Sequence, residues 1–315
     1  MKISGTGSAI PKQVVTNDML SEFLDTSDAW IYPRTGIRER RVISDENLED
    51  LAAEAAVKAL ENAGISASEL DYIICSNVVN EYVTPSLSCI IQGKIGASCP
   101  CVDINCACAG FIYALDIAES RFQAGRAKNI LIVCAEEPTR MTSWKDRNVC
   151  VLFGDGAGAA VLTPGDNIKA VRLSASSAIE PLCQKRVLEP TPYITKEEEG
   201  YSLRMKGQDV FKFAVRTSSG DLNALLSEVG MKPDDIDYYL LHQANIRIIN
   251  AIREYLGQPS EKFPTIVEKC GNMSSASCPI LLDTCNRNGL LKRGDKLALS
   301  AFGAGLISGA AIIEW

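Results

Sequence analysis

The chain repeats one short pattern in its two halves. Residues 64–76 read GISASELDYIICS and residues 230–242 read GMKPDDIDYYLLH, so each copy has a glycine followed seven positions later by aspartate, tyrosine and an apolar run. Apolar residues at helical spacing precede the first copy in 51–64, and a glycine suited to a helix terminus ends that segment. The order helix, loop and strand therefore occurs twice and predicts two similar α/β halves.

Two glycine-rich segments support the duplication. FGDGAGAAVL at 153–162 resembles FGAGLISGAAII at 302–313, and each copy is expected to lie between two strands. The glycines of 154–158 also resemble a nucleotide-binding loop, but such a loop opens a helix, whereas the following AAVLTPGDN is typical of a strand and a turn. We therefore expect a tight hairpin with close backbone packing there. Two stacked α/β halves fit both repeats better than a generic two-domain enzyme, which stays open as an alternative.

The composition indicates a soluble globular protein and disfavours some partners. The chain has 315 residues, of which 46% are hydrophobic and 23% charged. Its formal net charge of -7 argues against nucleic acid as the main partner. The first residues lack the apolar region of a secretory signal, and no run of about 18 uncharged apolar residues occurs. We expect a cytoplasmic protein with no membrane partner.

Twelve cysteines are present, but the chain is long and begins without a secretory signal, so a disulfide framework is not expected. Cys75, Cys134 and Cys150 sit in apolar runs typical of strands, where cysteine acts as a small buried hydrophobe. Another four lie close together in the pattern C-x-C-x4-C-x-C: Cys99, Cys101, Cys106 and Cys108. Structural zinc sites space each pair by two to four residues, so this spacing disfavours a metal site, and a reducing compartment disfavours a disulfide between the last two.

Cys108 is a better candidate for a nucleophile. The preceding residues 101–105 read as a strand, and the apolar positions within 111–122 have helical spacing. A cysteine at this strand-to-helix turn lies near the positive end of the helix dipole, which is expected to lower its thiol pKa, and Cys106 lies farther from the helix start. The single histidine, His242, ends an apolar run before another helical pattern, a position where open α/β folds gather their chemistry.

At these residues the sequence resembles the thiolase-like condensing enzymes, and within them the β-ketoacyl-acyl-carrier-protein synthase III family. The resemblance covers nearly the whole chain. It rests on six segments in the family's order: TSDAWIYPRTGIRER (26–40), CACAGF (106–111), FGDGAGA (153–159), LLHQANIRII (240–249), CGNMSSAS (270–277) and SAFGAG (300–305). It implies a thiolase-like α/β fold with αβαβα layers, in which residues 1–165 carry the nucleophile and residues 166–315 carry the histidine and an asparagine.

The resemblance also implies a chemistry. Cys108, His242 and Asn272 match a Cys-His-Asn triad, in which the cysteine takes an acyl group from acyl-CoA. Backbone N–H groups of Cys108 and of residues 303–305 would hold the oxyanion. Malonyl-acyl-carrier protein would then lose CO2, and the resulting enolate would attack the acyl-cysteine to start fatty acid synthesis. Coenzyme A enters as a substrate thioester, and no metal or redox cofactor is implied.

Three further positions match coenzyme A contacts of the family. Trp30 and Arg147 match a pair that holds adenine between a ring face and a guanidinium plane, and Arg34 matches a contact nearby. Gln208 stands where an asparagine is common at the pantetheine tunnel. Thr84 stands where acetyl-using members carry a bulky aromatic at the acyl pocket, so a longer or branched primer is an alternative, as is a related condensing enzyme of secondary metabolism.

Ala304 replaces a glycine of the family's last glycine run. If the position requires a positive φ, alanine there is strained by roughly 1 kcal/mol or more.

The implied acyl carrier protein is acidic, which raises the question of a basic surface on this acidic chain. Lys212 and Arg216 are four residues apart and share a helix face, and Arg247 and Arg253 lie on the next helix. We interpret these four residues as a carrier-protein surface, with an ordinary solvated face as the alternative. The family is commonly a homodimer in which a loop near residue 84 touches the partner's tunnel.

Other classes fit less well. A metal or redox module would need more histidine or regular cysteine spacing, and a non-catalytic scaffold would not need the triad. A thiolase proper would need a second reactive cysteine, for which Cys278 or Cys285 could be proposed, yet FGAGLISG carries none where that branch needs it. Residues 166–203 receive no function, and EPTPYITKEEEG within them is expected to be an exposed loop.

Overall fold

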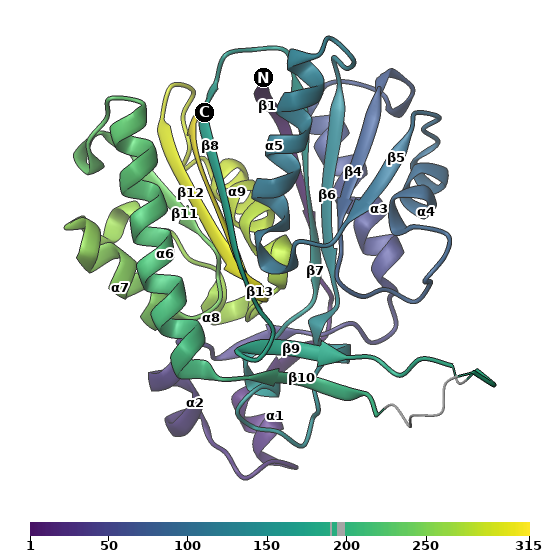
Figure 1. The fold of residues 1–315 in the computed structure, drawn as a ribbon, viewed down its shortest axis with the longest axis vertical. Coiled ribbons are helices and arrows are strands. Elements are labelled where there is room, and N and C mark those ends of the chain that lie inside the picture. Colours follow the sequence, from purple (N-terminus) through teal and green to yellow (C-terminus); the bar gives the residue numbers. More distant parts are fainter. Residues whose placement is uncertain (190, 194–198) are drawn as a thin grey trace.

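Helices and sheets alternate in layers across the molecule (Figure 1). The computed structural model describes residues 1–189, 191–193 and 199–315. Apolar side chains of α3 (Leu48–Ala63) and α4 (Leu87–Ile95) pack on the outer face of one sheet, and those of α6 (Gly207–Glu228) and α7 (Ile246–Leu256) pack on the outer face of the other. A third core between the sheets contains α5 (Gly110–Gln123) and α9 (Ser277–Arg287). The predicted αβαβα arrangement is confirmed.

Both sheets are mixed and share a pairing scheme. The first has the order β1-β7-β6-β4-β5 and the second the order β11-β12-β13-β8. In each, two parallel neighbours (β4 and β6, or β11 and β12) are followed by two antiparallel pairings. The strands are β1 (Lys2–Ala9), β4 (Tyr72–Ser76), β5 (Cys101–Ile104), β6 (Ile130–Glu136), β7 (Gly156–Thr163), β8 (Ile168–Ala178), β11 (Tyr238–Leu241), β12 (Lys296–Gly303) and β13 (Gly305–Glu314).

The repeated sequence pattern forms the same structure twice. Helix α3, a 3-10 turn at Ala67–Glu69 and strand β4 make up the first copy, and α6, a 3-10 turn at Pro233–Asp235 and β11 make up the second. The predicted duplication of helix, loop and strand is therefore confirmed.

Each half also has a 3-10 turn before its central helix, Ala107–Ala109 before α5 and Ser274–Ala276 before α9. Both turns begin with a left-handed residue, Ala107 at φ 43° and Ser274 at φ 50°.

Short elements lie below the layers in Figure 1, at the end of the sheets where β12 and β13 meet. They are β2 (Val14–Thr16), α1 (Asn17–Ser21), α2 (Asp28–Thr35), β3 (Glu39–Arg41), β9 (Leu182–Lys185), β10 (Tyr201–Met205) and α8 (Val267–Cys270). Part of the predicted exposed loop, residues 190 and 194–198, lies outside the described residues. Among the residues that are described, no helix has the length and apolar character needed to cross a membrane.

The glycine-rich segment at 153–162 differs from the prediction. Cys150 is buried as expected, but residues 150–152 form a 3-10 turn and not a strand. Strand β7 pairs with β1 and β6, both distant in the sequence, so no tight hairpin forms here, whereas β12 and β13 do turn directly into each other. Close packing is the reason for the glycines, because a Cβ on Gly154 would lie 2.1 Å from the Cys270 carbonyl oxygen.

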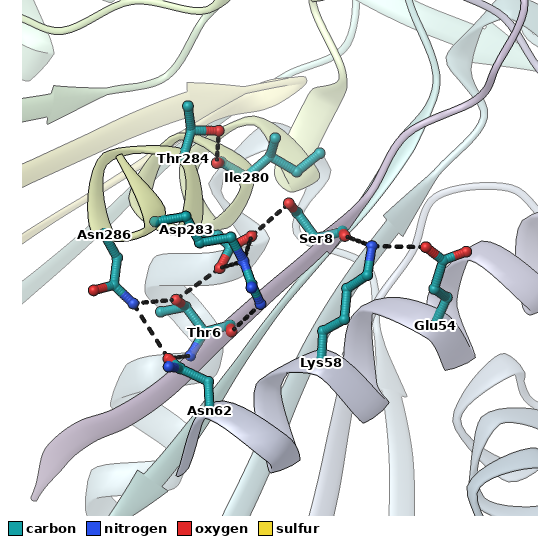
Figure 2. Close-up of polar contacts among 10 residues, drawn as sticks. Thr6, Ser8, Glu54, Lys58, Asn62, Ile280, Asp283, Thr284 and Asn286 are labelled. Atoms are coloured by element: carbon teal, nitrogen blue, oxygen red, sulfur yellow. Dashed lines mark hydrogen bonds and ion pairs between the residues drawn. The ribbon is translucent and has the colours of Figure 1, made fainter. Parts of the chain in front are cut away.

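Side chains from two layers satisfy the polar groups of edge strand β1 (Figure 2). Asp283 of α9 is 1% exposed and accepts hydrogen bonds from the Thr6 hydroxyl (2.8 Å) and the Ser8 hydroxyl (2.6 Å). From α3, Asn62 Oδ1 accepts from the Thr6 backbone N–H (2.9 Å) and Lys58 Nζ donates to the Ser8 carbonyl (2.9 Å). The open edge is thereby protected from pairing with another chain, and the N-terminal strand is tied to a helix of the C-terminal half.

Candidate active site

A pocket of about 820 Å³ brings the three predicted catalytic residues together. Cys108, His242 and Asn272 all line it, together with Phe302 and Gly303 of strand β12. Their segments are far apart in the sequence, and each lies at the end of a strand or at the start of a central helix. The parallel strands β11 and β12 bring His242 to the same sheet end as Phe302.

Cys108 is the middle residue of the 3-10 turn Ala107–Ala109, and α5 begins two residues later at Gly110. The prediction of a turn between strand and helix is confirmed. The expected lowering of its pKa is wrong, because burial raises the pKa of the Cys108 thiol to about 12. The thiol needs a proton acceptor or a substrate to become a thiolate.

His242 follows strand β11 directly, and its backbone N–H donates to the Ser300 carbonyl at 2.8 Å. The ring meets the edge of Phe302, with 5.3 Å between ring centroids. Burial lowers the pKa of His242 to about 3, so the imidazole is neutral at physiological pH. A neutral imidazole donates from one nitrogen only, and Nδ1 is buried without a hydrogen-bond partner in the described part of the chain.

Asn272 is held rigidly by its own loop and by the glycine-rich segment before β7. Its backbone N–H donates to Leu152, its carbonyl accepts from Gly154, and its side-chain Oδ1 accepts from the Ser274 backbone N–H at 2.9 Å. Because Oδ1 is occupied, the amide offers Nδ2 as a donor. The glycine-rich segment and the residue before it thus position the asparagine.

The glycine run at 303–305 lies close to the 3-10 turn that contains Cys108. A Cβ on Gly303 would lie 2.7 Å from the backbone nitrogen of Cys108. Positive φ values in this run fall on Gly305 (81°) and Leu306 (51°). Ala304 has no positive φ, so the strain considered for alanine at this position does not arise.

The residues matched to coenzyme A contacts gather at one part of the pocket. Trp30 and Arg34 line it, and the guanidinium carbons of Arg34 and Arg147 lie 4.9 and 5.1 Å from the Trp30 ring centroid. Arg147 also contacts Asp25 through an ion pair of 2.9 Å. Two cations beside one indole form a surface suited to a flat, electron-rich ring with phosphates nearby.

The other predicted residues divide into two groups. Gln208, Lys212 and Arg247 line the pocket, whereas Arg216 is exposed nearby on α6. Arg253 and Thr84 do not line the pocket either. Arg253 is only partly exposed and contacts Glu254 at 3.5 Å. Thr84 is exposed and does not line the pocket of its own chain.

The described residues also show whether the four closely spaced cysteines 99, 101, 106 and 108 could form a metal site. Within the described residues there is no group of three or more histidine, cysteine, aspartate or glutamate side chains that could bind a metal ion. All twelve cysteines have free thiols.

Comparison with known proteins decides the family. Residues 102–178 match the model described as 3-Oxoacyl-[acyl-carrier-protein (ACP)] synthase III, and residues 226–315 match the model of its C terminal. Over 318 aligned residues the chain is 41% identical to the Beta-ketoacyl-[acyl-carrier-protein] synthase III of Xanthomonas euvesicatoria, with 100% of this chain and 98% of that protein covered. The chain belongs to the 3-oxoacyl-(acyl-carrier-protein) synthase III family.

Solved structures of synthase III enzymes support this family assignment. The 3-oxoacyl-(acyl-carrier-protein) synthase III of Aquifex aeolicus superposes with a TM-score of 0.93 at 42% identity, covering 100% of this chain and 99% of that one. The enzyme from Thermus thermophilus gives a TM-score of 0.93 at 36% identity, with the same coverage. The resemblance predicted from six sequence segments is confirmed.

The sequence reasoning did not single out Glu136, which lies at the end of β6 and is fully buried. Its carboxylate accepts hydrogen bonds from the side chains of Ser274 and Ser275, both of the loop that follows Asn272. A signal was present in ILIVCAE, because a carboxylate directly after a run of apolar strand residues must be buried or face the functional end of the sheet.

Proposed function

We propose that this synthase III condenses an acyl-CoA primer with malonyl-acyl-carrier protein, with loss of CO2, to give the 3-oxoacyl product that starts fatty acid synthesis. The observation that carries the proposal is the single pocket lined by Cys108, His242 and Asn272. As a member of the family the protein is an acyltransferase, and the synthase III names of its relatives do not favour secondary metabolism.

In the first half-reaction, Cys108 Sγ attacks the thioester carbon. The tetrahedral oxyanion would be held by backbone N–H groups of Cys108 and of the glycine run at 303–305, whose close approach supports this role. Collapse of the intermediate releases coenzyme A and leaves an acyl-cysteine. Trp30 and the guanidinium groups of Arg34 and Arg147 would bind the adenine and phosphates.

In the second half-reaction, malonyl-acyl-carrier protein occupies the same pocket. Loss of CO2 places negative charge on its thioester oxygen. Neutral His242, donating from Nε2, and Asn272, donating from Nδ2, would stabilise that charge. The enolate carbon attacks the acyl-cysteine, and Cys108 leaves as a thiolate. The chemistry needs no metal or redox cofactor, with coenzyme A serving as the substrate carrier.

Partners and location follow from the same proposal. Exposed Lys212, Arg216 and Arg247 near the pocket would attract an acidic carrier protein, while Arg253 contributes less because it is partly covered. The exposed position of Thr84 fits the acyl pocket only if it enters a partner's tunnel, which supports a homodimer. We place the protein in the cytoplasm.

Intact-mass measurement tests the nucleophile. Wild type, Cys108→Ser and Cys106→Ser proteins are incubated with acyl-CoA thioesters of increasing length, and malonyl-acyl-carrier protein is then added. We expect one acyl adduct on wild type and on Cys106→Ser, none on Cys108→Ser, and discharge of the adduct as a 3-oxoacyl product. An adduct that survives in Cys108→Ser, or no adduct with any primer, would contradict the proposal. The best primer length also tests the inference drawn from Thr84.

A further inference from the structure

In the proposed second half-reaction, His242 and Asn272 donate to the same oxygen atom, although they lie on different elements. His242 follows strand β11 and Asn272 follows helix α8, with helix α7 between them in the sequence. Two donors stabilise one developing charge best when their spacing is fixed before the reaction. A contact between the two segments is therefore needed, and the residue after His242 makes it.

Gln243 is a polar residue with 0% exposure, and it is not among the residues that line the pocket. Its Oε1 accepts hydrogen bonds from the backbone N–H groups of Ile266 (2.9 Å) and Val267 (3.3 Å), and its Nε2 donates to the Leu241 carbonyl at 2.7 Å. Both partners of Oε1 are donors and the partner of Nε2 is an acceptor, so the amide fits in one orientation only. All three partners are backbone groups, so this side chain fixes the chain around it.

The two N–H groups held by Gln243 lie at the start of α8. A helix leaves its first N–H groups without an intrahelical acceptor, and the N-cap residue of α8, Ile266, makes no capping hydrogen bond through its side chain. Gln243 supplies the acceptor from the end of β11. The helix that leads to Asn272 is thus capped by the residue next to His242.

The hydrogen bonds of α8 extend this placement to Asn272. The N–H groups of Cys270 and Gly271 donate to the carbonyls of Ile266 and Val267, both at 3.0 Å, and Asn272 comes next. One short helix therefore separates the contacts of Gln243 from the asparagine.

We propose that Gln243 is a positioning residue that sets the separation between the His242 and Asn272 donors and thereby controls the decarboxylation step. This inference rests on the proposed roles of those two residues. The glycine-rich segment also holds Asn272, but it does so from the first half and not from the strand of His242. In the proposed first half-reaction the oxyanion is held by backbone donors, so acylation of Cys108 should not depend on Gln243.

The test measures the two half-reactions separately in one protein. Wild type and variants are first acylated with acyl-CoA, and the acyl-enzyme is counted by intact mass. Malonyl-acyl-carrier protein labelled in its free carboxyl group is then added, and CO2 release is followed. Gln243→Met removes the hydrogen bonds at similar side-chain volume. It should slow CO2 release per acyl-enzyme by about 10- to 100-fold, because small misplacements of catalytic groups have effects of this size, while acylation proceeds at the wild-type rate.

Gln243→Asn provides a second measurement if Gln243→Met folds poorly. The amide is kept but is one methylene shorter, so it cannot reach the Leu241 carbonyl and the two N–H groups of α8 together. CO2 release should be slower than in wild type in this variant as well. Because the rates are expressed per acyl-enzyme, unfolded protein does not contribute to either measurement.

Gln258→Met is the matched control. Gln258 is a buried glutamine of the same half, donates to Asp234 Oδ1 at 2.6 Å and is not among the residues that line the pocket. Its variant should keep the wild-type rates of both steps. Wild-type CO2 release in Gln243→Met or Gln243→Asn would overturn the inference. An equal loss of acylation and CO2 release would overturn it too, because a merely structural role lowers both rates together.

The single histidine separates this inference from the proposed function. If acylated wild type releases no CO2, the proposed function fails. The 15N signal of His242 still reports its placement in that case, and it should shift in Gln243→Met but not in Gln258→Met. An unshifted signal in Gln243→Met would overturn the positioning role.

Discussion

Gly303 lies so close to the cysteine turn that an added Cβ would be 2.7 Å from Cys108 N and 2.8 Å from Ala107 Cβ. Neither neighbour can move freely, because Cys108 N is a backbone atom and Ala107 Cβ is bonded directly to the backbone. Gly303→Ala should therefore displace the turn and slow acylation of Cys108 by about 100-fold, the usual effect of losing one oxyanion donor. Intact mass against time measures this rate.

The control for this prediction is Gly93→Ala. Gly93 lies inside α4, and a Cβ there meets nothing within 4 Å. Alanine should stabilise the helix by about 0.5–1 kcal/mol and leave acylation unchanged. Equal acylation rates in both variants would show that the close approach does not matter for the reaction.

The single histidine permits a direct test of charge. Burial lowers the pKa of His242 to about 3, so 15N-labelled histidine should show one neutral imidazole signal throughout the physiological pH range. The unfolded chain takes up this proton from about pH 6.5 downward. The stabilising contribution of the neutral ring is therefore present above that pH and is lost as the pH falls toward 3. An NMR signal of the folded protein that titrates near pH 6.5 would contradict the burial argument.

Trp30→Ala should weaken the binding of acyl-CoA but not of the corresponding acyl-pantetheine thioester, which has no adenine. Loss of a ring contacted by two guanidinium groups should raise the KM for acyl-CoA by about tenfold. Steady-state acylation with both substrates measures the difference. The adenine role is wrong if both KM values rise together.

Reversal of charge near the pocket should weaken the carrier protein selectively. Lys212→Glu with Arg247→Glu should raise the KM for malonyl-acyl-carrier protein more than the KM for acyl-CoA, most strongly at low salt. Arg126→Glu with Lys128→Glu makes the same charge change at exposed residues before β6, at the strand end opposite Glu136. A similar loss in this second variant would attribute the effect to net charge and not to a docking surface.

Asp283 should be important for stability and not for chemistry. Its removal leaves the hydroxyls of Thr6 and Ser8 without an acceptor and breaks a 2.9 Å contact with Arg287. Asp283→Ala should lower the free energy of unfolding by about 2–4 kcal/mol in urea denaturation. Asp166→Ala at a fully exposed position should change it by less than about 0.5 kcal/mol, and equal losses in the two variants would contradict the importance of the buried network.

The sequence predicted what depends on periodicity and order along the chain. The repeated helix, loop and strand, the turn at Cys108 and the strand end at His242 follow from local spacing, and the structure confirms them. Asn272 was accessible only through family resemblance, because a turn asparagine looks the same in sequence. Properties that depend on tertiary packing were missed or wrong: the raised pKa of Cys108, the 3-10 turn at Cys150 and the contact of Glu136 with Ser274.

The residues proposed to react come from different halves of the chain. Cys108 belongs to a turn completed early in the chain, whereas His242 and Asn272 follow more than a hundred residues later. During synthesis the proposed nucleophile therefore emerges from the ribosome long before the groups proposed to polarise a thioester. These residues come together only when the two halves pack against each other. The hydrogen bonds of Asp283 to the first strand stabilise that packing. A nascent chain that stops before His242 therefore has the cysteine without the groups proposed to act with it on a thioester.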